Sequence, residues 1–140
     1  MGGEHFSSAT GKDLDKEKDA YVRFRWETKK GEKRPKQTIL EREKIQENKD
    51  LSDWIEQNYL KHPERCVCCL KKEAFPLLRF EVYNWKRPKS EEGFFAHYEC
   101  LQTAWSKLWA TCEGLRLRNS VLLRRTGRRR NITQIIGDEV

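Results

Sequence analysis

Four metal-ligand side chains at paired spacings constrain this chain more than any other feature of its sequence. Cys66 and Cys69 form a C-x2-C pair, and His97 and Cys100 form an H-x2-C pair beyond the intervening segment 70–96. Two cysteines in a tight turn aim both thiolates at one point, and His-x-x-Cys at the start of a helix does the same. The four predict one tetrahedral zinc site, which is structural because a closed ligand set leaves no position for water.

Neighbouring residues leave alternatives to this ligand set open. Cys68 could replace Cys69 if the turn is distorted, and His62 could compete with His97, although a solvent-facing His62 is favoured. Cys112 lies more than three helical turns beyond Cys100 and is expected to be a buried thiol. Five cysteines in a chain with no secretory signal indicate metal ligands and spare thiols rather than disulfides.

The composition predicts a single small core with flexible ends. The chain has 140 residues, of which 36% are charged and 36% hydrophobic, so closure of a loop by zinc could decide whether it folds. No segment approaches the roughly 18 apolar residues of a membrane span, and the N-terminus lacks the basic and apolar parts of a signal peptide. We therefore expect a protein of the nucleus or cytoplasm that is neither secreted nor bound to a membrane.

The part of the chain before the first cysteine pair is expected to contain little packed structure. Residues 1–20 are polar and predict disorder, whereas the alternation over 21–26 predicts a half-buried strand followed by a charged linker. A charged helix is expected from a Thr38 cap to about Asn48, and a second one from Ser52 or Asp53 to residue 61. The predicted divisions are a largely disordered arm (1–37), a charged helical segment (38–61), a zinc-finger domain (62–114) and an arginine-rich C-terminal segment (115–140).

The pattern after the first cysteine pair predicts an α+β fold. A strand over 77–85, a loop with Pro88 and a returning strand over 93–97 form a hairpin, and a helix over 98–113 follows, with Gly114 as its C-cap. Trp105 and Trp109 are expected in the core. The order of knuckle, β-hairpin and helix, with ligands at the knuckle and at the helix start, is that of a small treble-clef zinc finger with flanking short helices.

Residues 64–114 resemble the zinc finger of poly(ADP-ribose) polymerases and of the DNA ligase related to them. The resemblance lies in the Cys66-x2-Cys69 pair, the strand, Gly93-Phe94-Phe95-Ala96-His97-Tyr98-Glu99-Cys100 and the aromatic helix after it. It implies that Cys66, Cys69, His97 and Cys100 are the metal ligands. It also implies nucleic-acid binding through basic hairpin residues. Nothing in the chain resembles a catalytic ADP-ribosylating domain.

Basic residues point to a polyanionic partner. The net charge is +7, and the segment between Leu115 and Asn131 holds seven arginines and no acidic residue. The planar guanidinium grips phosphate oxygens in pairs, although a solvated tail or a nuclear localisation signal would have the same composition. Phe80, Tyr83 and Trp85 could stack on bases, and the alternative is that Phe80 and Trp85 belong to the core. The predicted nucleic-acid contacts are Arg79, Lys86, Arg87, Lys89, Arg116, Arg118, Arg124, Arg125, Arg128, Arg129 and Arg130.

These observations favour a zinc-dependent regulatory protein that binds DNA or RNA mainly through phosphates. Its size and composition resemble the small cysteine-rich accessory proteins of viruses that bind nucleic acid or suppress host defence. The alternative is a protein-interaction adaptor whose arginines direct nuclear import. An enzyme is not expected, because only His5 and His62 remain as general bases once His97 binds the metal, and both lie outside the finger.

Overall fold

A four-stranded antiparallel sheet organises the molecule. The computed structural model describes residues 5–126, with side chains up to residue 117. The strands lie in the order β2-β1-β3-β4 and are β1 (Tyr21–Glu27), β2 (Lys36–Glu41), β3 (Leu77–Tyr83) and β4 (Glu91–His97). The helices are α1 (Arg42–Gln46), α2 (Lys49–Asn58), α3 (Tyr98–Ala104) and α4 (Ser106–Thr126). The α+β class is confirmed, and the predicted hairpin is present as β3 and β4.

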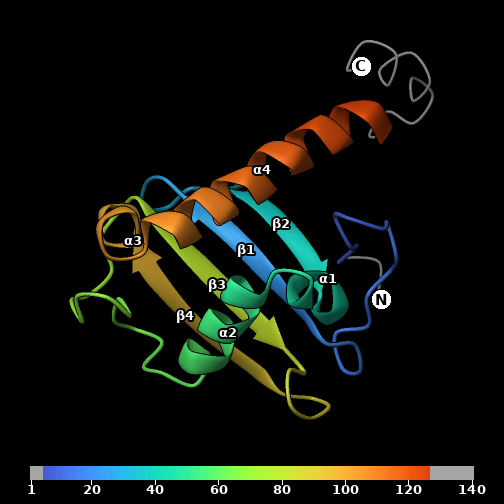
Figure 1. The fold of residues 1–140 in the computed structure, drawn as a ribbon, viewed down its shortest axis with the longest axis horizontal. Coiled ribbons are helices and arrows are strands. Elements are labelled where there is room, and N and C mark those ends of the chain that lie inside the picture. The colour runs from blue at the N-terminus through green and yellow to red at the C-terminus, as the bar shows by residue number, and fades with distance from the viewer. Residues whose placement is uncertain (1–4, 127–140) are drawn as a thin grey trace.

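The main core lies between one face of the sheet and the helices α1, α2 and α4, which cross in front of it in Figure 1. Phe24 on β1 stands opposite Phe80 on β3, and Phe80 stands opposite Phe94 on β4. The Phe80 and Phe94 rings stack with centroids 4.6 Å apart, and Trp54 of α2 meets Phe80 edge to face at 5.1 Å. Aromatic residues on adjacent strands thus form the centre of the core.

The aromatic residues of β3 and its following loop are buried: Phe80 and Trp85 lie in this main core, and Tyr83 lies in a smaller cluster on the other face of the sheet. Phe80 is fully buried, and Tyr83 and Trp85 are 2% and 1% exposed. The Trp85 indole N–H donates to a Glu56 carboxylate oxygen at 2.8 Å. The interpretation of Phe80 and Trp85 as core residues is confirmed, and none of the three rings is available to stack on bases.

The segment before β1 is ordered from residue 5 onward, so the predicted disorder of residues 1–20 is wrong for the part that the structure describes. Leu14 is 1% exposed and packs with Tyr21, Ile39 and Tyr83 on the sheet face opposite the helices. The His5 Nδ1 atom lies 2.6 Å from the Tyr21 hydroxyl. A few anchoring side chains order the segment, because the sheet supplies an apolar surface that the sequence pattern could not reveal.

The middle of this second sheet face carries ion pairs. Arg23 and Arg25 both contact the Glu81 carboxylate, at 2.6 and 2.8 Å. Arg79 contacts Glu27 at 2.9 Å and also pairs with a second glutamate. Because each of these arginines has a carboxylate partner, this face of the sheet carries little net positive charge.

Two of the predicted helices differ from the structure. The residues expected to begin a helix at Thr38 form β2 instead, because Thr38, Ile39 and Leu40 are buried against β1. Helix α2 begins earlier than expected, after an Asn48 cap whose side chain accepts from the Leu51 N–H at 3.0 Å. Tertiary pairing with β1 therefore overrides the local helical preference of the 38–41 segment.

The predicted helix over 98–113 is two helices. The chain breaks at Trp105, whose φ of −139° is not helical, and that ring is 46% exposed rather than in the core. Trp109 is partly buried and its ring lies 4.9 Å from that of Tyr98. Helix α4 continues through Gly114, so this glycine is not a C-cap. No helix within residues 5–126 is long and apolar enough to cross a membrane.

Candidate metal centre

The first ligand pair lies on a tight turn attached to the end of β4. The backbone of Cys66 forms a bridge with Phe95, and the Val67 N–H donates to the Phe95 carbonyl at 3.0 Å. The Leu70 N–H donates to the Cys66 carbonyl at 2.8 Å and closes the turn. The last strand of the sheet therefore positions the knuckle predicted at Cys66–Cys69.

Leu70 closes the knuckle at a backbone cost. Its φ is +65°, in the left-handed region that favours glycine, and its side chain is 65% exposed. A residue with a Cβ pays about 1–2 kcal/mol for this conformation. The turn thus keeps a strained residue whose side chain contributes little packing, which indicates that the turn geometry itself is important.

The second ligand pair lies where β4 passes into α3. His97 is the last residue of β4 and the N-cap position of α3, and Cys100 lies in the first turn of that helix. The Tyr98 N–H donates to the Pro76 carbonyl at 3.1 Å, which attaches the helix start to the chain before β3. The strand-to-helix corner thereby directs both side chains toward the knuckle.

The four predicted ligands converge. One ligand atom from each of Cys66, Cys69, His97 and Cys100 lies within 4.8 Å of the other three. The His97 Nδ1 atom is 3.4 Å from the Cys69 sulfur and 3.6 Å from the Cys100 sulfur. These residues can hold one metal ion, and they are the only such cluster of cysteine, histidine or carboxylate groups found among residues 5–126.

The alternative ligands lie outside this cluster. Cys68 is partly buried beside the four but is not one of the converging groups. His62 is exposed, and its Nδ1 atom accepts the Glu64 N–H at 3.1 Å. Cys112 is completely buried on α4, as expected, and burial raises the pKa of its thiol to about 12. The geometry thus favours Cys69 over Cys68 and His97 over His62.

The hydrogen bond on the far side of His97 sets its tautomer. The Nε2 atom lies 2.9 Å from the Lys72 carbonyl oxygen, which can only accept. The proton therefore belongs on Nε2, and the Nδ1 lone pair faces the sulfur atoms. A carbonyl that accepts a hydrogen bond from the nitrogen remote from the metal orients a metal-binding imidazole and raises the basicity of the other nitrogen.

Backbone N–H groups favour ionisation of the most buried ligand. Burial opposes a thiolate at Cys66, but the N–H groups of Cys69 and Cys68 lie 3.5 and 3.3 Å from its sulfur. Their effect prevails and lowers the pKa of Cys66 from 9.0 to about 7. Burial and the nearby thiols raise the pKa of Cys68 and of Cys100 to about 12. Cys100 would therefore need a bound cation to ionise at neutral pH.

The donor set fits a closed tetrahedral ion. Three thiolates and one neutral imidazole are ligands typical of structural zinc, and all four positions are supplied by the protein. With a divalent ion such a site carries a net charge of about −1. A bound ion would join the knuckle, the end of β4 and the start of α3, because each of these elements contributes a ligand.

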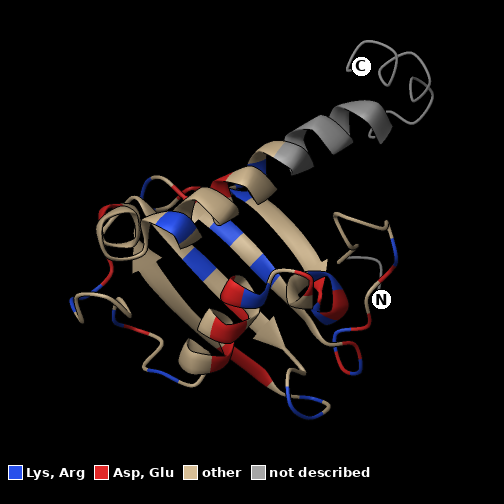
Figure 2. Cartoon of the chain, in the orientation of Figure 1, with Lys and Arg blue, Asp and Glu red and all other residues tan. Residues whose placement is uncertain are grey.

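The residues predicted to contact nucleic acid do not gather at one place among the described side chains. Arg79 is ion-paired with Glu27 on the sheet face opposite the helices, and Arg116 on α4 pairs with Glu113 at 2.7 Å. Lys86, Arg87 and Lys89 lie in the loop between β3 and β4, at the end of the sheet opposite the metal centre (Figure 1). Figure 2 shows the basic residues of this loop in blue, apart from those on the strands. The remaining predicted contacts lie outside the described side chains: Arg118, Arg124, Arg125, Arg128, Arg129 and Arg130.

The structure adds backbone groups that sequence reasoning did not identify. The Lys72 and Phe95 carbonyls hold the histidine and the knuckle, and no residue-type pattern marks such contributions. Comparison of the chain with protein-family models, with curated proteins and with solved structures finds no match. The interpretation of the metal centre therefore rests on its own residues and geometry.

Proposed function

We propose that this protein is a zinc-dependent nucleic-acid-binding regulator, in which one zinc ion has a structural role. Zinc is supported by the closed Cys3His donor set and by the His97 tautomer that leaves Nδ1 free to bind. The knuckle, the β3–β4 hairpin and α3 follow one another in the order of a treble clef, and we assign the metal module to that class. A closed ligand set is typical of structural rather than catalytic zinc.

One observation carries the proposed nucleic-acid binding: the arginine-rich segment begins on a helix anchored beside the metal centre. Helix α4 runs without a break from Ser106 to Thr126. Its first turns pack through Leu108 and Cys112, both in the core cluster that includes Leu101 of the ligand-bearing helix α3. An ion held by Cys100 would fix α3, and α3 would fix the start of α4.

The metal part of the proposal is tested by replacing one of two adjacent thiols. Native mass spectrometry should find one zinc ion per chain in the wild type and in Cys68→Ser, and none in Cys69→Ser. The two variants differ only in which neighbouring cysteine is lost, so they control for the effect of the substitution itself. Zinc retained by Cys69→Ser, or absent from the wild type, would contradict the proposed ligand set.

The nucleic-acid part is tested by salt dependence. If about four arginines contact phosphates, the slope of log affinity against log salt for duplex DNA should be about −3 to −4. Fluorescence anisotropy of the full chain with duplex DNA, duplex RNA and single strands would give this slope and the preferred nucleic acid. Absence of binding at low salt, or an affinity that does not change with salt, would refute the proposal.

A pair of variants distinguishes binding through the C-terminal arginines from attraction by the net charge of the protein. Replacing Arg128, Arg129 and Arg130 by Gln should weaken binding and flatten the salt slope. Replacing Lys29, Lys30 and Lys33 in the turn between β1 and β2 by Gln removes the same charge and should have a much smaller effect. Equal losses in both variants would mean that only overall charge attracts the nucleic acid.

A protein-interaction adaptor is the second candidate, and the exposed Trp105 ring favours it. This ring lies at a cavity of about 450 Å³ between α2 and the junction of α3 with α4, lined also by Trp54 and Leu108. Exposed aromatic rings are common at protein interfaces. A photo-crosslinking residue at position 105 should then give protein adducts in cells, whereas one at Arg34 should not. Adducts at neither position would leave the adaptor without support.

A further inference from the structure

Arg42 is the one partly buried arginine, among the described side chains, that lacks a carboxylate partner. The other four, Arg23, Arg25, Arg79 and Arg116, have carboxylate oxygens at 2.6, 2.8, 2.9 and 2.7 Å. Within the described part of the chain, no carboxylate oxygen lies within 4.0 Å of an Arg42 nitrogen. Because a guanidinium that leaves water is normally paired, Arg42 calls for a different explanation.

The surroundings of Arg42 hold its side chain but leave most of its donors unused. One terminal nitrogen donates to the Trp85 carbonyl oxygen, and the guanidinium carbon lies 5.9 Å from the Trp85 ring centroid. A guanidinium has five N–H donors, and the other Arg42 donors make no hydrogen bond to the described part of the protein. The side chain is therefore oriented by the protein and still able to bind two acceptor oxygens.

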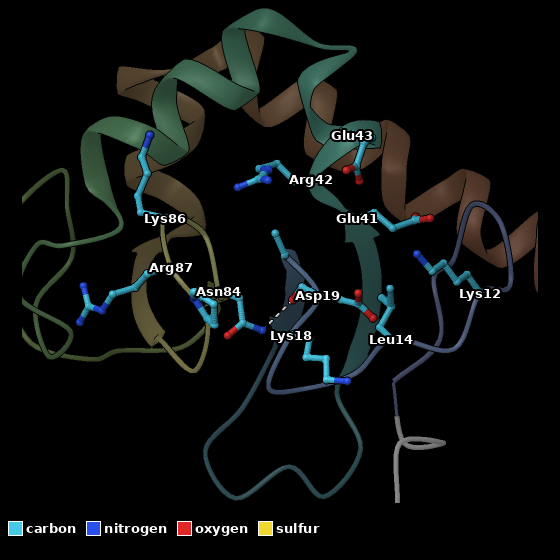
Figure 3. A pocket seen from close by; sticks show the side chains of 12 residues that line it. Lys12, Leu14, Lys18, Asp19, Glu41, Arg42, Glu43, Asn84, Lys86 and Arg87 are labelled. Atoms are coloured by element: carbon cyan, nitrogen blue, oxygen red, sulfur yellow. Dashed lines mark hydrogen bonds between the residues drawn. The ribbon is translucent and has the colours of Figure 1, made fainter.

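These donors face a cavity of about 360 Å³ at the end of the sheet remote from the metal centre (Figure 3). The cavity forms where the N-terminal segment meets the β3–β4 loop, because the Asn84 amide donates to the Lys16 and Asp19 carbonyls at 3.0 and 2.7 Å. Five cationic side chains line it: Lys12, Lys18, Arg42, Lys86 and Arg87. Only Lys86 among them makes an ion pair with a described residue, at 2.8 Å from Glu56.

Two of the three carboxylates in the cavity wall already accept hydrogen bonds from the protein. The Glu41 carboxylate accepts the Ser7 and Thr10 hydroxyls. Figure 3 shows it pointing away from Arg42 and toward Lys12. An Asp19 carboxylate oxygen accepts the Asp15 N–H at 2.7 Å. The third carboxylate, Glu43, is exposed. Outside the wall, the Glu56 carboxylate pairs with Lys86 and also interacts electrostatically with Arg42. The wall itself holds five cationic side chains against three carboxylates, so the cavity keeps an excess of positive charge (Figure 3).

We propose that this cavity binds a phosphate group, and that its source is the backbone of a nucleic-acid strand. The nucleic-acid origin of the phosphate rests on the proposed function. The binding of a phosphate group rests on the residues of the cavity alone. The Arg42 guanidinium would bind two phosphate oxygens in parallel, and Arg87 would neutralise part of the remaining charge. The Trp85 ring is buried and presents no face for a base, so the cavity recognises phosphate without reading sequence.

A charge-matched pair of variants of the full chain tests whether the bound phosphate belongs to a nucleic-acid strand. Arg42→Gln should weaken binding of a single-stranded 20-mer about tenfold and reduce the salt slope by about 1. Arg34→Gln removes the same charge from an exposed position and should change the affinity by less than about twofold. Equal behaviour of the two variants would overturn the assignment of the strand phosphate to this cavity. If Arg42→Gln does not fold, Arg87→Gln in the exposed loop replaces it, with an expected loss of about threefold.

Titration with inorganic phosphate tests the cavity independently of the proposed function. Phosphate should shift the Arg42 Nε–Hε NMR signal in a saturable way and leave the Arg34 signal unchanged. If this shift occurs while no nucleic acid binds, the phosphate site stands and the proposed function fails. If nucleic acid binds but neither phosphate nor the Arg42 substitution has an effect, the proposed function stands and the phosphate site is wrong.

Discussion

Removal of the metal should release α3 and the knuckle while the sheet stays folded. The perturbation is a zinc chelator added to the full chain under reducing conditions at neutral pH. The ion would join elements that are otherwise weakly attached, whereas β1 and β3 lie at the centre of the sheet and contribute no ligand. Loss of the ion therefore has a local effect, although the composition suggested that it could decide the whole fold.

The expected magnitude follows from what α3 buries. Leu101 is fully buried and Tyr98 partly so, which together contributes about 4 kcal/mol, and about three helical hydrogen bonds add roughly 1 kcal/mol each. Ordering the backbone of this seven-residue helix costs about 7 kcal/mol at the low end of the accepted range. These contributions nearly cancel, so α3 is marginal without the ion. The sheet keeps its full set of buried aromatic contacts.

Hydrogen exchange followed by mass spectrometry measures the outcome. After chelation, peptides covering 66–72 and 98–104 should lose protection by about a hundredfold or more, while those covering 21–27 and 77–83 should change by less than about threefold. Cys68→Ser provides the control, since it should bind zinc and retain the wild-type pattern. Loss of protection throughout the sheet, or no loss at α3, would refute this reasoning.

Three further predictions concern single side chains. Glu81→Gln should lower the free energy of unfolding by about 2 kcal/mol in urea at pH 7, because it removes the shared partner of Arg23 and Arg25. Although burial opposes ionisation, these arginines lower the pKa of Glu81 below 4.5; its contribution is therefore present above the unfolded pKa and should disappear as pH falls through the folded one. Leu70→Gly should raise stability by about 0.5 kcal/mol by relieving the left-handed conformation, and a loss would contradict the inferred strain. Phe80→Ala should cost about 3–5 kcal/mol in the same assay, and a loss below about 1 kcal/mol would exclude its central place in the core.

Local patterns in the sequence were enough to predict the candidate metal centre and the hairpin beside it. The spacing of Cys66 and Cys69 depends on one turn, and that of His97 and Cys100 on one strand-to-helix corner. The strand periodicity between the two ligand pairs predicts a hairpin that brings the two pairs together. Each of these features depends on residues a few positions apart, so the short-range pattern contains the required information.

Tertiary structure alone decided the features that depend on distant partners. The 38–41 segment is a strand because β1 pairs with it, and residues 5–20 are ordered because Tyr21 and Tyr83 give Leu14 an apolar surface. Likewise, Arg42 stands out only when every other partly buried arginine among the described side chains is seen to have a carboxylate partner. The sequence by itself determined which residues can hold an ion, since ligand chemistry belongs to residue types at short spacing. The sheet decided which residues are covered, paired or left with open donors, since those properties depend on neighbours far away in the chain.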